Sequence, residues 1–215
     1  MKHVFVESNW VFSSCAPKHL RRPAAERLLE RARAGELRLY LPAVCLREGG
    51  DAIRKKCQPR VPDEMRSFLA TARREGQLSS ESADGVTQAL ELYRARVTRE
   101  LHVLNDTLEA VRTTPGVEAF ALSEVMLERA IQLRADGVND LKPFDEAILA
   151  AVLVKARALR DQHAAETDFS IAFCTLDGDL KPWARDGTRR EPLASLYDQE
   201  MLTVYPDFAA VAGAP

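Results

Sequence analysis

Four short apolar runs alternate with longer helix-like segments along the chain, and this alternation limits the folds that are open to it. The runs cover residues 2–6, 37–41, 169–174 and 202–205. They are rich in β-branched and aromatic residues and are bounded by residues that favour turns or helix starts, which is typical of buried strands. Strands that alternate with helices predict an α/β fold with a mainly parallel central sheet flanked by helices.

The segments between these runs predict helices over 23–34, 44–56, 145–160 and 192–198. We interpret Ser8-Asn9 as a turn that closes the first strand. Residues 63–135 form a long helical stretch, in which 80–111 carry apolar residues at intervals of three or four and predict one amphipathic helix. A chain of 215 residues is near the size of one domain. We therefore expect a single domain over 1–215 with a helical insertion at about 63–135.

Cysteine usage and hydropathy point to a reducing compartment and away from a membrane. The four cysteines form no CxxC pair and no zinc spacing with the four histidines. We expect Cys45 and Cys174, which lie in apolar runs, to be buried thiols. Glu7 interrupts the first apolar run too early for a signal peptide, and the longest apolar run, 147–154, is too short to cross a bilayer. A cytoplasmic location fits these features best.

The net charge of −2 conceals an uneven distribution. Residues 1–75 carry 16 Lys and Arg against 9 Asp and Glu, whereas 76–215 carry 14 against 23. The basic part contains two clusters, Lys18-His19-Leu20-Arg21-Arg22 and Arg54-Lys55-Lys56. Each cluster either contacts a phosphate backbone or forms a solvated helix face, and the sequence leaves both interpretations open.

Five acidic residues lie where a predicted strand ends or a predicted helix begins: Glu7, Glu48, Asp145, Asp177 and Asp179. In an open α/β sheet, ligands bind outside the carboxyl ends of the strands, so we expect these side chains to gather there. Carboxylates that lie close together repel one another unless protons or a cation neutralise them. Hard divalent ions such as Mg²⁺ and Mn²⁺ prefer oxygen ligands. The pattern therefore predicts a metal site that hydrolyses phosphodiesters.

The acidic residues also have structural interpretations, which stay open at this point. Asp145 opens a helix, where the helix dipole favours an acid. Glu48 can be an exposed helix residue, and Glu7 a surface carboxylate after an edge strand. Asp177 and Asp179 can belong to a simple turn.

Polar and basic residues beside these acids are candidates for substrate binding. Ser8, Asn9 and Thr175 would orient the carboxylates or bind a substrate phosphate, although each is also a common turn residue. Lys142 and Lys181 lie beside the acidic motifs and would contact a nucleic-acid backbone.

The segment FCTLDGDL resembles the phosphatase loop of the haloacid dehalogenase superfamily, in which an apolar strand ends in D-x-D-G. That chemistry needs a nucleophilic aspartate at the first position, and this chain has Thr175 there. A hydroxyl at that position does not form an aspartyl phosphate, which argues against this interpretation.

Four motifs, taken in order, resemble those of the PIN domain, a nuclease fold that includes the VapC-type toxins. VFVESN resembles its opening strand and acidic residue, and LYLPAVCLREG its second strand, proline and glutamate. PFDEAILAA resembles its aspartate at the start of an Ala-rich helix, and CTLDGDL its T-x-D segment. The resemblance covers 1–58 and about 139–210, and it leaves 63–135 unexplained.

The resemblance implies a metal-dependent endoribonuclease that hydrolyses RNA. Glu7, Glu48, Asp145 and Asp177 would be its catalytic residues, and together with Asp179 they would hold Mg²⁺ or Mn²⁺. A role as the toxin of a toxin–antitoxin pair would add an antitoxin protein as a partner, and the resemblance also implies a homodimer.

Glu7 departs from the family pattern, which usually has Asp at this position. Glutamate keeps the charge but adds a methylene, so its carboxylate reaches further and has more rotamers to fix. The departure supports an alternative: a non-catalytic PIN-like protein with a degenerate metal site, which binds nucleic acid or acts as a scaffold.

Overall fold

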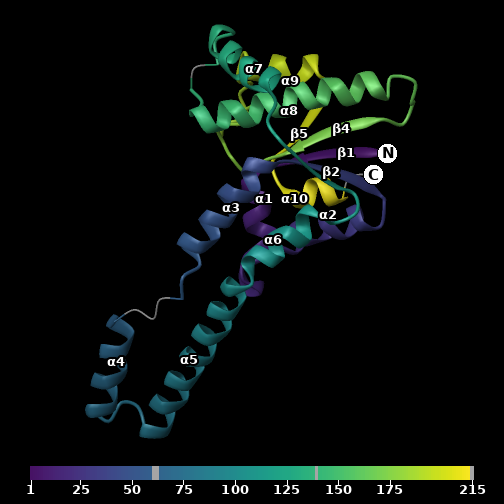
Figure 1. The fold of residues 1–215 in the computed structure, drawn as a ribbon. Coiled ribbons are helices and arrows are strands. Elements are labelled where there is room, and N and C mark those ends of the chain that lie inside the picture. The colour runs from purple at the N-terminus through teal and green to yellow at the C-terminus, as the bar shows by residue number, and fades with distance from the viewer. Residues whose placement is uncertain (60–62, 139, 214–215) are drawn as a thin grey trace.

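A five-stranded sheet forms the centre of the protein (Figure 1), which a computed structural model describes over residues 1–59, 63–138 and 140–213. The strand order is β3-β2-β1-β4-β5, and each neighbouring pair is parallel. This confirms the predicted α/β fold with a parallel sheet. The strands are β1 (Lys2–Val6), β2 (Leu37–Pro42), β3 (Val117–Phe120), β4 (Ser170–Cys174) and β5 (Leu202–Tyr205).

Helices flank the sheet on both sides, as the sequence predicted (Figure 1). On one side lie α7 (Glu124–Ala135), α8 (Pro143–Gln162) and α9 (Leu193–Gln199). On the other lie α1 (Ser8–Cys15), α2 (Pro23–Arg33), α3 (Ala43–Lys56), α6 (Leu104–Arg112) and α10 (Phe208–Gly213). A short 3-10 helix, η1 (Lys18–Leu20), joins α1 to α2.

The chain changes direction across the sheet between β1 and β4. From β1 it builds outward through β2 to β3, and α7 and α8 then carry it back to β4 and β5 on the other side of β1. In an open α/β sheet a crevice forms where the strand order reverses, outside the carboxyl ends of the two adjacent strands. The fold therefore places a natural binding position beside the ends of β1 and β4.

The central strands are apolar on both faces because helices cover both faces. Val4 and Val6 of β1 and Phe173 of β4 are fully buried. A parallel sheet that is covered on both sides requires such continuous apolar runs, and this is why the sequence indicates these strands clearly. Cys45 and Cys174 are buried free thiols, as predicted.

Two local predictions about helices are wrong. Ser8-Asn9 is the start of α1 and not a turn, because the Glu7 side chain accepts the Asn9 N–H and caps the helix. Serine and asparagine favour helix starts as well as turns, so the residue types alone did not decide between them. The segment 80–111 is two helices, α5 (Ser80–His102) and α6, which meet at Val103.

Strand β3 was missed because its own residues carry little strand signal. Glu118 and Ala119 are poor strand formers, and the strand is fixed by its pairing with residues 39–42 of β2. Gly116, just before it, has a φ of +81°, and a Cβ there would lie 2.2 Å from the backbone oxygen of Ala32. Glycine is required where the chain passes this close to α2.

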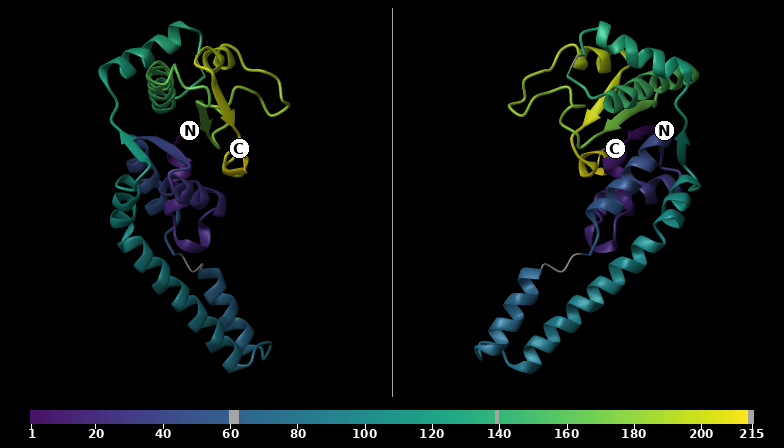
Figure 2. Two further views of the ribbon diagram at one scale, coloured as in Figure 1. Left: turned by 90° about the vertical axis from the view of Figure 1, so that its right-hand side faces the viewer. Right: turned by 60° about the vertical axis from the view of Figure 1, so that its left-hand side comes forward.

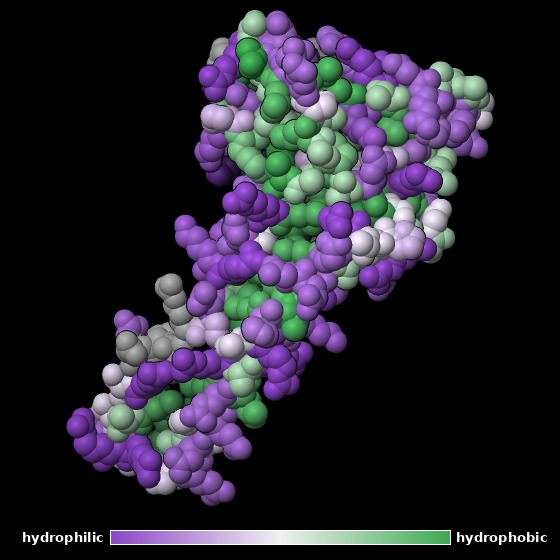
Figure 3. All heavy atoms as spheres, viewed as in Figure 1, coloured by the Kyte–Doolittle hydropathy of each residue, from purple (hydrophilic) through white to green (hydrophobic). Residues whose placement is uncertain are grey.

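Helices α4 (Asp63–Arg74) and α5 form a hairpin that projects away from the sheet (Figure 2). Its base is attached to η1, where the Lys18 N–H donates to the Glu100 carboxylate at 2.6 Å. Further out, Phe68 and Leu92 are exposed at 61% and 66%. Figure 3 shows apolar residues along the hairpin as a band between charged ones. The hairpin therefore mainly adds surface to the protein, although Leu101 near its base packs against the hydrophobic core.

Helices α1 and α3 approach each other closely at Gly49. A Cβ at this position would lie 2.6 Å from Cβ of the buried Val11 and 3.2 Å from the backbone oxygen of Ser8. No real side chain fits at such distances, so the glycine allows the two helices to touch. Because Glu48 precedes Gly49, this contact also brings Glu48 beside the start of α1.

We predict that Gly49→Ala destabilises the protein by about 1–3 kcal/mol, because the added methyl group overpacks the contact between α1 and α3. The matched control is Gly85→Ala in α5, where an added Cβ meets nothing within 4 Å. This control is expected to be neutral or stabilising by up to about 1 kcal/mol, since alanine is the better helix former. Urea denaturation followed by circular dichroism measures both, and equal stability of Gly49→Ala and the unmodified protein would contradict the prediction.

Candidate functional site

Glu7 and Thr175 meet where β1 and β4 end. Val6, the last residue of β1, is in register with Cys174, the last residue of β4, so the residues that follow them lie side by side. The Thr175 hydroxyl donates a hydrogen bond to Oε1 of Glu7 at 3.4 Å. Thr175 is fully buried, so its side chain positions Glu7 and does not face the solvent.

The carboxylate of Glu7 is buried and held by several donors. The residue is only 4% exposed, and the Asn9 N–H donates to its Oε2 at 2.7 Å. Burial raises the pKa of Glu7, the nearby charge of Asp177 raises it further, and hydrogen bonds from Asn9 and from the backbone of Leu176 oppose the rise. Glu7 is therefore not the surface carboxylate of an edge strand, because β1 is the central strand of the sheet.

Glu48 reaches the site from α3. It is exposed, and its Oε2 accepts a hydrogen bond from the Ser8 hydroxyl in the first turn of α1. Ser8 thus fixes Glu48, while the neighbouring Asn9 fixes Glu7. The short helix that the sequence prediction missed is the element that connects these two acids.

Asp145 is half-buried in the first turn of α8. Burial raises its pKa, and the charges of Asp177, Glu48 and Asp179 add to the rise, while Lys142 opposes it. A helix N-terminus by itself would stabilise the ionised carboxylate and lower its pKa. Burial and the neighbouring acids thus act on the pKa of Asp145 in the direction opposite to the helix dipole.

Asp177 lies in the turn that follows β4. Its N–H donates to the Thr175 hydroxyl oxygen at 3.0 Å, and its Oδ1 accepts the N–H of Asp179 at 2.8 Å. The backbone of this segment therefore forms a turn, as the alternative interpretation of Asp177 and Asp179 expected. The Asp177 side chain also lines the pocket that contains the other acids. Asp179 is exposed and acts on Asp145 through its charge.

Four of the five acids line one pocket of about 490 Å³. Glu7, Glu48, Asp145 and Asp177 come from four separate segments and all face it. Of the residues predicted to bind substrate, Ser8 and Asn9 line the pocket, whereas Thr175, Lys142 and Lys181 are not among its lining residues, and neither is Asp179.

The pocket also contains residues that the sequence did not assign to the site. Arg22 and Lys56 line it, and each is the last member of one of the two basic clusters. Phe12 of α1 and Phe144 beside Asp145 line it as well. The basic clusters were visible in the sequence, but which of their members face the acids follows only from the folded chain. Phe12 carried no signal because its helix was not predicted.

The donor chemistry of the pocket fits a hard divalent cation. Carboxylate oxygens are the ligands that Mg²⁺ and Mn²⁺ prefer. Burial is the main cause of the raised pKa values of Glu7 and Asp145, and a cation would offset the smaller contribution that neighbouring acids make. Among residues 1–59, 63–138 and 140–213, no group of three or more His, Cys, Asp or Glu side chains is arranged to hold a metal ion. The acids thus share a pocket without forming a complete ligand set in this arrangement.

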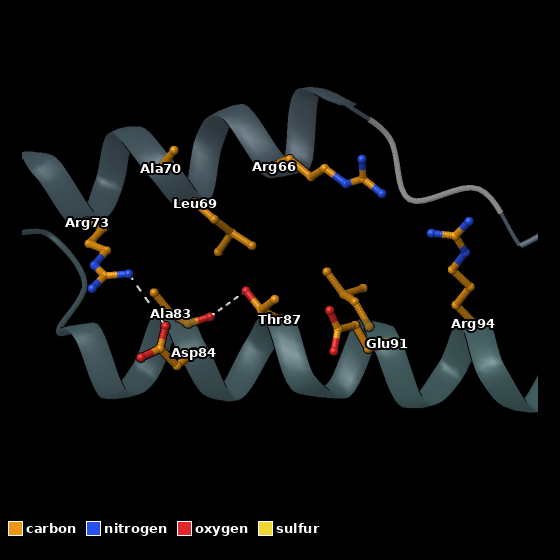
Figure 4. A pocket seen from close by; sticks show the side chains of 10 residues that line it. Arg66, Leu69, Ala70, Arg73, Ala83, Asp84, Thr87, Glu91 and Arg94 are labelled. Atoms are coloured by element: carbon orange, nitrogen blue, oxygen red, sulfur yellow. Dashed lines mark hydrogen bonds and ion pairs between the residues drawn. The ribbon is translucent and has the colours of Figure 1, made fainter.

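A second hollow of about 350 Å³ lies between α4 and α5 (Figure 4). Leu69 of α4 points toward α5, and Arg73 forms an ion pair with Asp84 at 3.5 Å beside it. None of the predicted site residues lines this hollow. It is a gap between the two helices of the hairpin, lined by apolar residues together with arginines and the acids Asp84 and Glu91.

No protein-family model matches the chain, and it matches none of the curated proteins or solved structures compared with it. In the part of the chain that the structure describes, no helix is long and apolar enough to cross a membrane.

We predict that Glu7→Gln raises the melting temperature at pH 7 without divalent ions. The pKa of Glu7 is higher in the folded chain than the ordinary value of 4.5, so its ionisation costs stability as the pH rises from 4.5 through the folded pKa. Glutamine keeps the shape and carries no charge. Below pH 4.5 both folded and unfolded wild type are protonated at this residue, and the advantage of the variant should disappear.

Thermal melts at a series of pH values measure this effect. Glu30→Gln, an exposed position on α2, is the control and should change the stability by less than about 0.5 kcal/mol. A Glu7→Gln variant that melts below the wild type at pH 7 would show that the buried charge is not costly.

Proposed function

We propose that the protein is a divalent-metal-dependent endoribonuclease with a PIN-like fold. One observation supports this most: Glu7, Glu48, Asp145 and Asp177, which lie far apart in the sequence, line one pocket at the point where the strand order reverses. Two of these acids, Glu7 and Asp145, have raised pKa values because of burial and, to a lesser extent, because of the nearby charge of Asp177. Perturbed acids that converge in a cleft at this position of an α/β sheet are expected of a catalytic centre.

Each acid has a separate role in this proposal. Glu7, Asp145 and Asp177 would have to come closer together than they lie in this arrangement to hold Mg²⁺ or Mn²⁺, with Asp179 beside them. Such an ion, when bound, would supply charge to neutralise the phosphate, to lower the pKa of a water molecule and to stabilise the leaving oxygen. Glu48, the exposed member, would accept the proton of the attacking water. Thr175 and Asn9 keep the Glu7 carboxylate in place through their hydrogen bonds, and Ser8 does the same for Glu48.

Phe144 supports a nucleic acid as the substrate. It follows the start of α8, is 36% exposed and lines the pocket next to Asp145. An exposed aromatic ring beside a phosphodiester-cleaving centre offers a base a surface on which to stack. The choice of RNA over DNA rests on the resemblance of the four sequence motifs to the PIN domain.

We predict that the protein cleaves a mixture of RNA substrates in the presence of Mn²⁺. Asp145→Asn should lower the cleavage rate by about 100-fold or more, because it removes a carboxylate that holds the metal. Loss of a residue that only orients a metal ligand usually costs about 10- to 100-fold. Asp140→Asn is the matched control, since Asp140 is exposed, precedes the same helix and does not line the pocket. Gel electrophoresis of labelled RNA measures the rates. Equal cleavage by the wild type and Asp145→Asn would remove the assignment of the site.

We also predict that Mn²⁺ raises the melting temperature of the wild type. An ion that binds only the folded state, at a concentration about 100 times its dissociation constant, adds about 2.7 kcal/mol, which corresponds to roughly 5–10 °C for a chain of this size. Asp145→Asn should show a much smaller shift, and EDTA should reverse the shift in the wild type. Absence of a shift in the wild type would favour the alternative, a PIN-like scaffold or nucleic-acid-binding protein with a degenerate metal site.

A further inference from the structure

The pocket has two parts of opposite charge. The four acids lie where β1 and β4 end, whereas Arg22 comes from the junction of η1 with α2 and Lys56 from the last turn of α3. Both basic side chains are exposed. The fold thus brings one cation from each of two clusters, 34 positions apart in the sequence, to the same pocket.

Neither cation is neutralised by an acid in the described part of the chain. Arg22 and Lys56 form no ion pair with any residue that the structure describes, although acids line the same pocket. The Nζ atom of Lys56 lies 5.7 Å from the centre of the Phe12 ring, which also lines the pocket. A cation above an aromatic ring is held in place and keeps its charge available to an anion.

We propose that Arg22 and Lys56 form a phosphate-binding subsite that holds the backbone of a nucleic-acid strand beside the carboxylates. This inference rests on the proposed function and deepens it, because it says which residues bind the phosphates next to the bond that is cleaved. A phosphodiester is repelled by four carboxylates, and two free cations on the same pocket offset that repulsion. The subsite favours a strand that extends beyond the cleaved bond over a substrate with a single phosphate.

In this subsite the positive charge of each side chain, and not its shape, attracts the phosphates of the strand. A cation that neutralises one phosphate of a single strand releases counterions, so its loss lowers the slope of log affinity against log salt by about 0.7. At 0.1 M salt the same loss weakens binding about fivefold. Arg22→Ala and Lys56→Gln should each show this change, and the double variant about twice the change in slope.

The experiment measures the binding of a fluorescein-labelled single-stranded RNA by fluorescence anisotropy, in EDTA so that no cleavage occurs, over a series of salt concentrations. Lys55→Gln is the matched control, because Lys55 is exposed on the same turn of α3 and does not line the pocket. It should bind with the wild-type affinity and slope. Lys56→Arg keeps the charge and should restore the slope that Lys56→Gln loses. Thermal melts of every variant confirm that each remains folded.

The outcomes separate the subsite from the proposed function. Wild-type affinity and slope in both Arg22→Ala and Lys56→Gln would overturn the subsite, whatever the protein does to RNA with Mn²⁺. Lowered slopes in these variants, with Asp145→Asn binding at least as tightly as the wild type, would support the subsite even if no cleavage is found. In that case the protein binds nucleic acid through these cations, and the nuclease assignment alone fails.

Discussion

The parallel pairing of β1 with β4 is the constraint on which the candidate site depends. Because Val6 and Cys174 are in register, Glu7 and Thr175 leave the sheet side by side, and the Thr175 hydroxyl can reach the buried carboxylate. The same hydroxyl accepts the N–H of Asp177, so one threonine connects an acid at the end of β1 to the turn that carries another. A shift of this register by one residue would separate these groups and exchange the faces to which the strand side chains point.

The site concentrates charge at the expense of stability. Glu7 is buried among acids, and its hydrogen bonds with Asn9, Leu176 and Thr175 only partly offset the loss of its hydration. Asp145 is in a similar position, since burial and neighbouring acids act against the helix dipole. A protein that needed only to fold would gain by replacing these groups with neutral ones. Their joint presence at the reversal point of the sheet is the strongest argument for chemistry there.

The sequence predicted those parts of the fold that local pattern determines. Strands β1, β2 and β4 and helix α8 are rich in apolar residues because they are buried. The acids could be assigned because each lies just after a strand or in the first two turns of a helix. Strand β3 and helix α1 were missed, since VEAF owes its conformation to β2 and Ser8-Asn9 suits a turn as well as a helix. Arg22 and Lys56 were visible only as members of charge clusters. Their place beside the acids depends on how η1, α2 and α3 pack together, and this packing cannot be predicted from local patterns in the sequence.

The order in which the strands pair has a consequence during synthesis of the chain on the ribosome. Strand β1 emerges first and β2 soon after it, but the other neighbour of β1, strand β4, begins only at Ser170. Until then, one edge of the central strand has no partner, and a nascent chain has neither Asp177 nor the threonine that holds Glu7. The pocket can be assembled only when most of the polypeptide has been translated. An unfinished chain would carry Glu7 and Glu48 without the acids that complete the pocket.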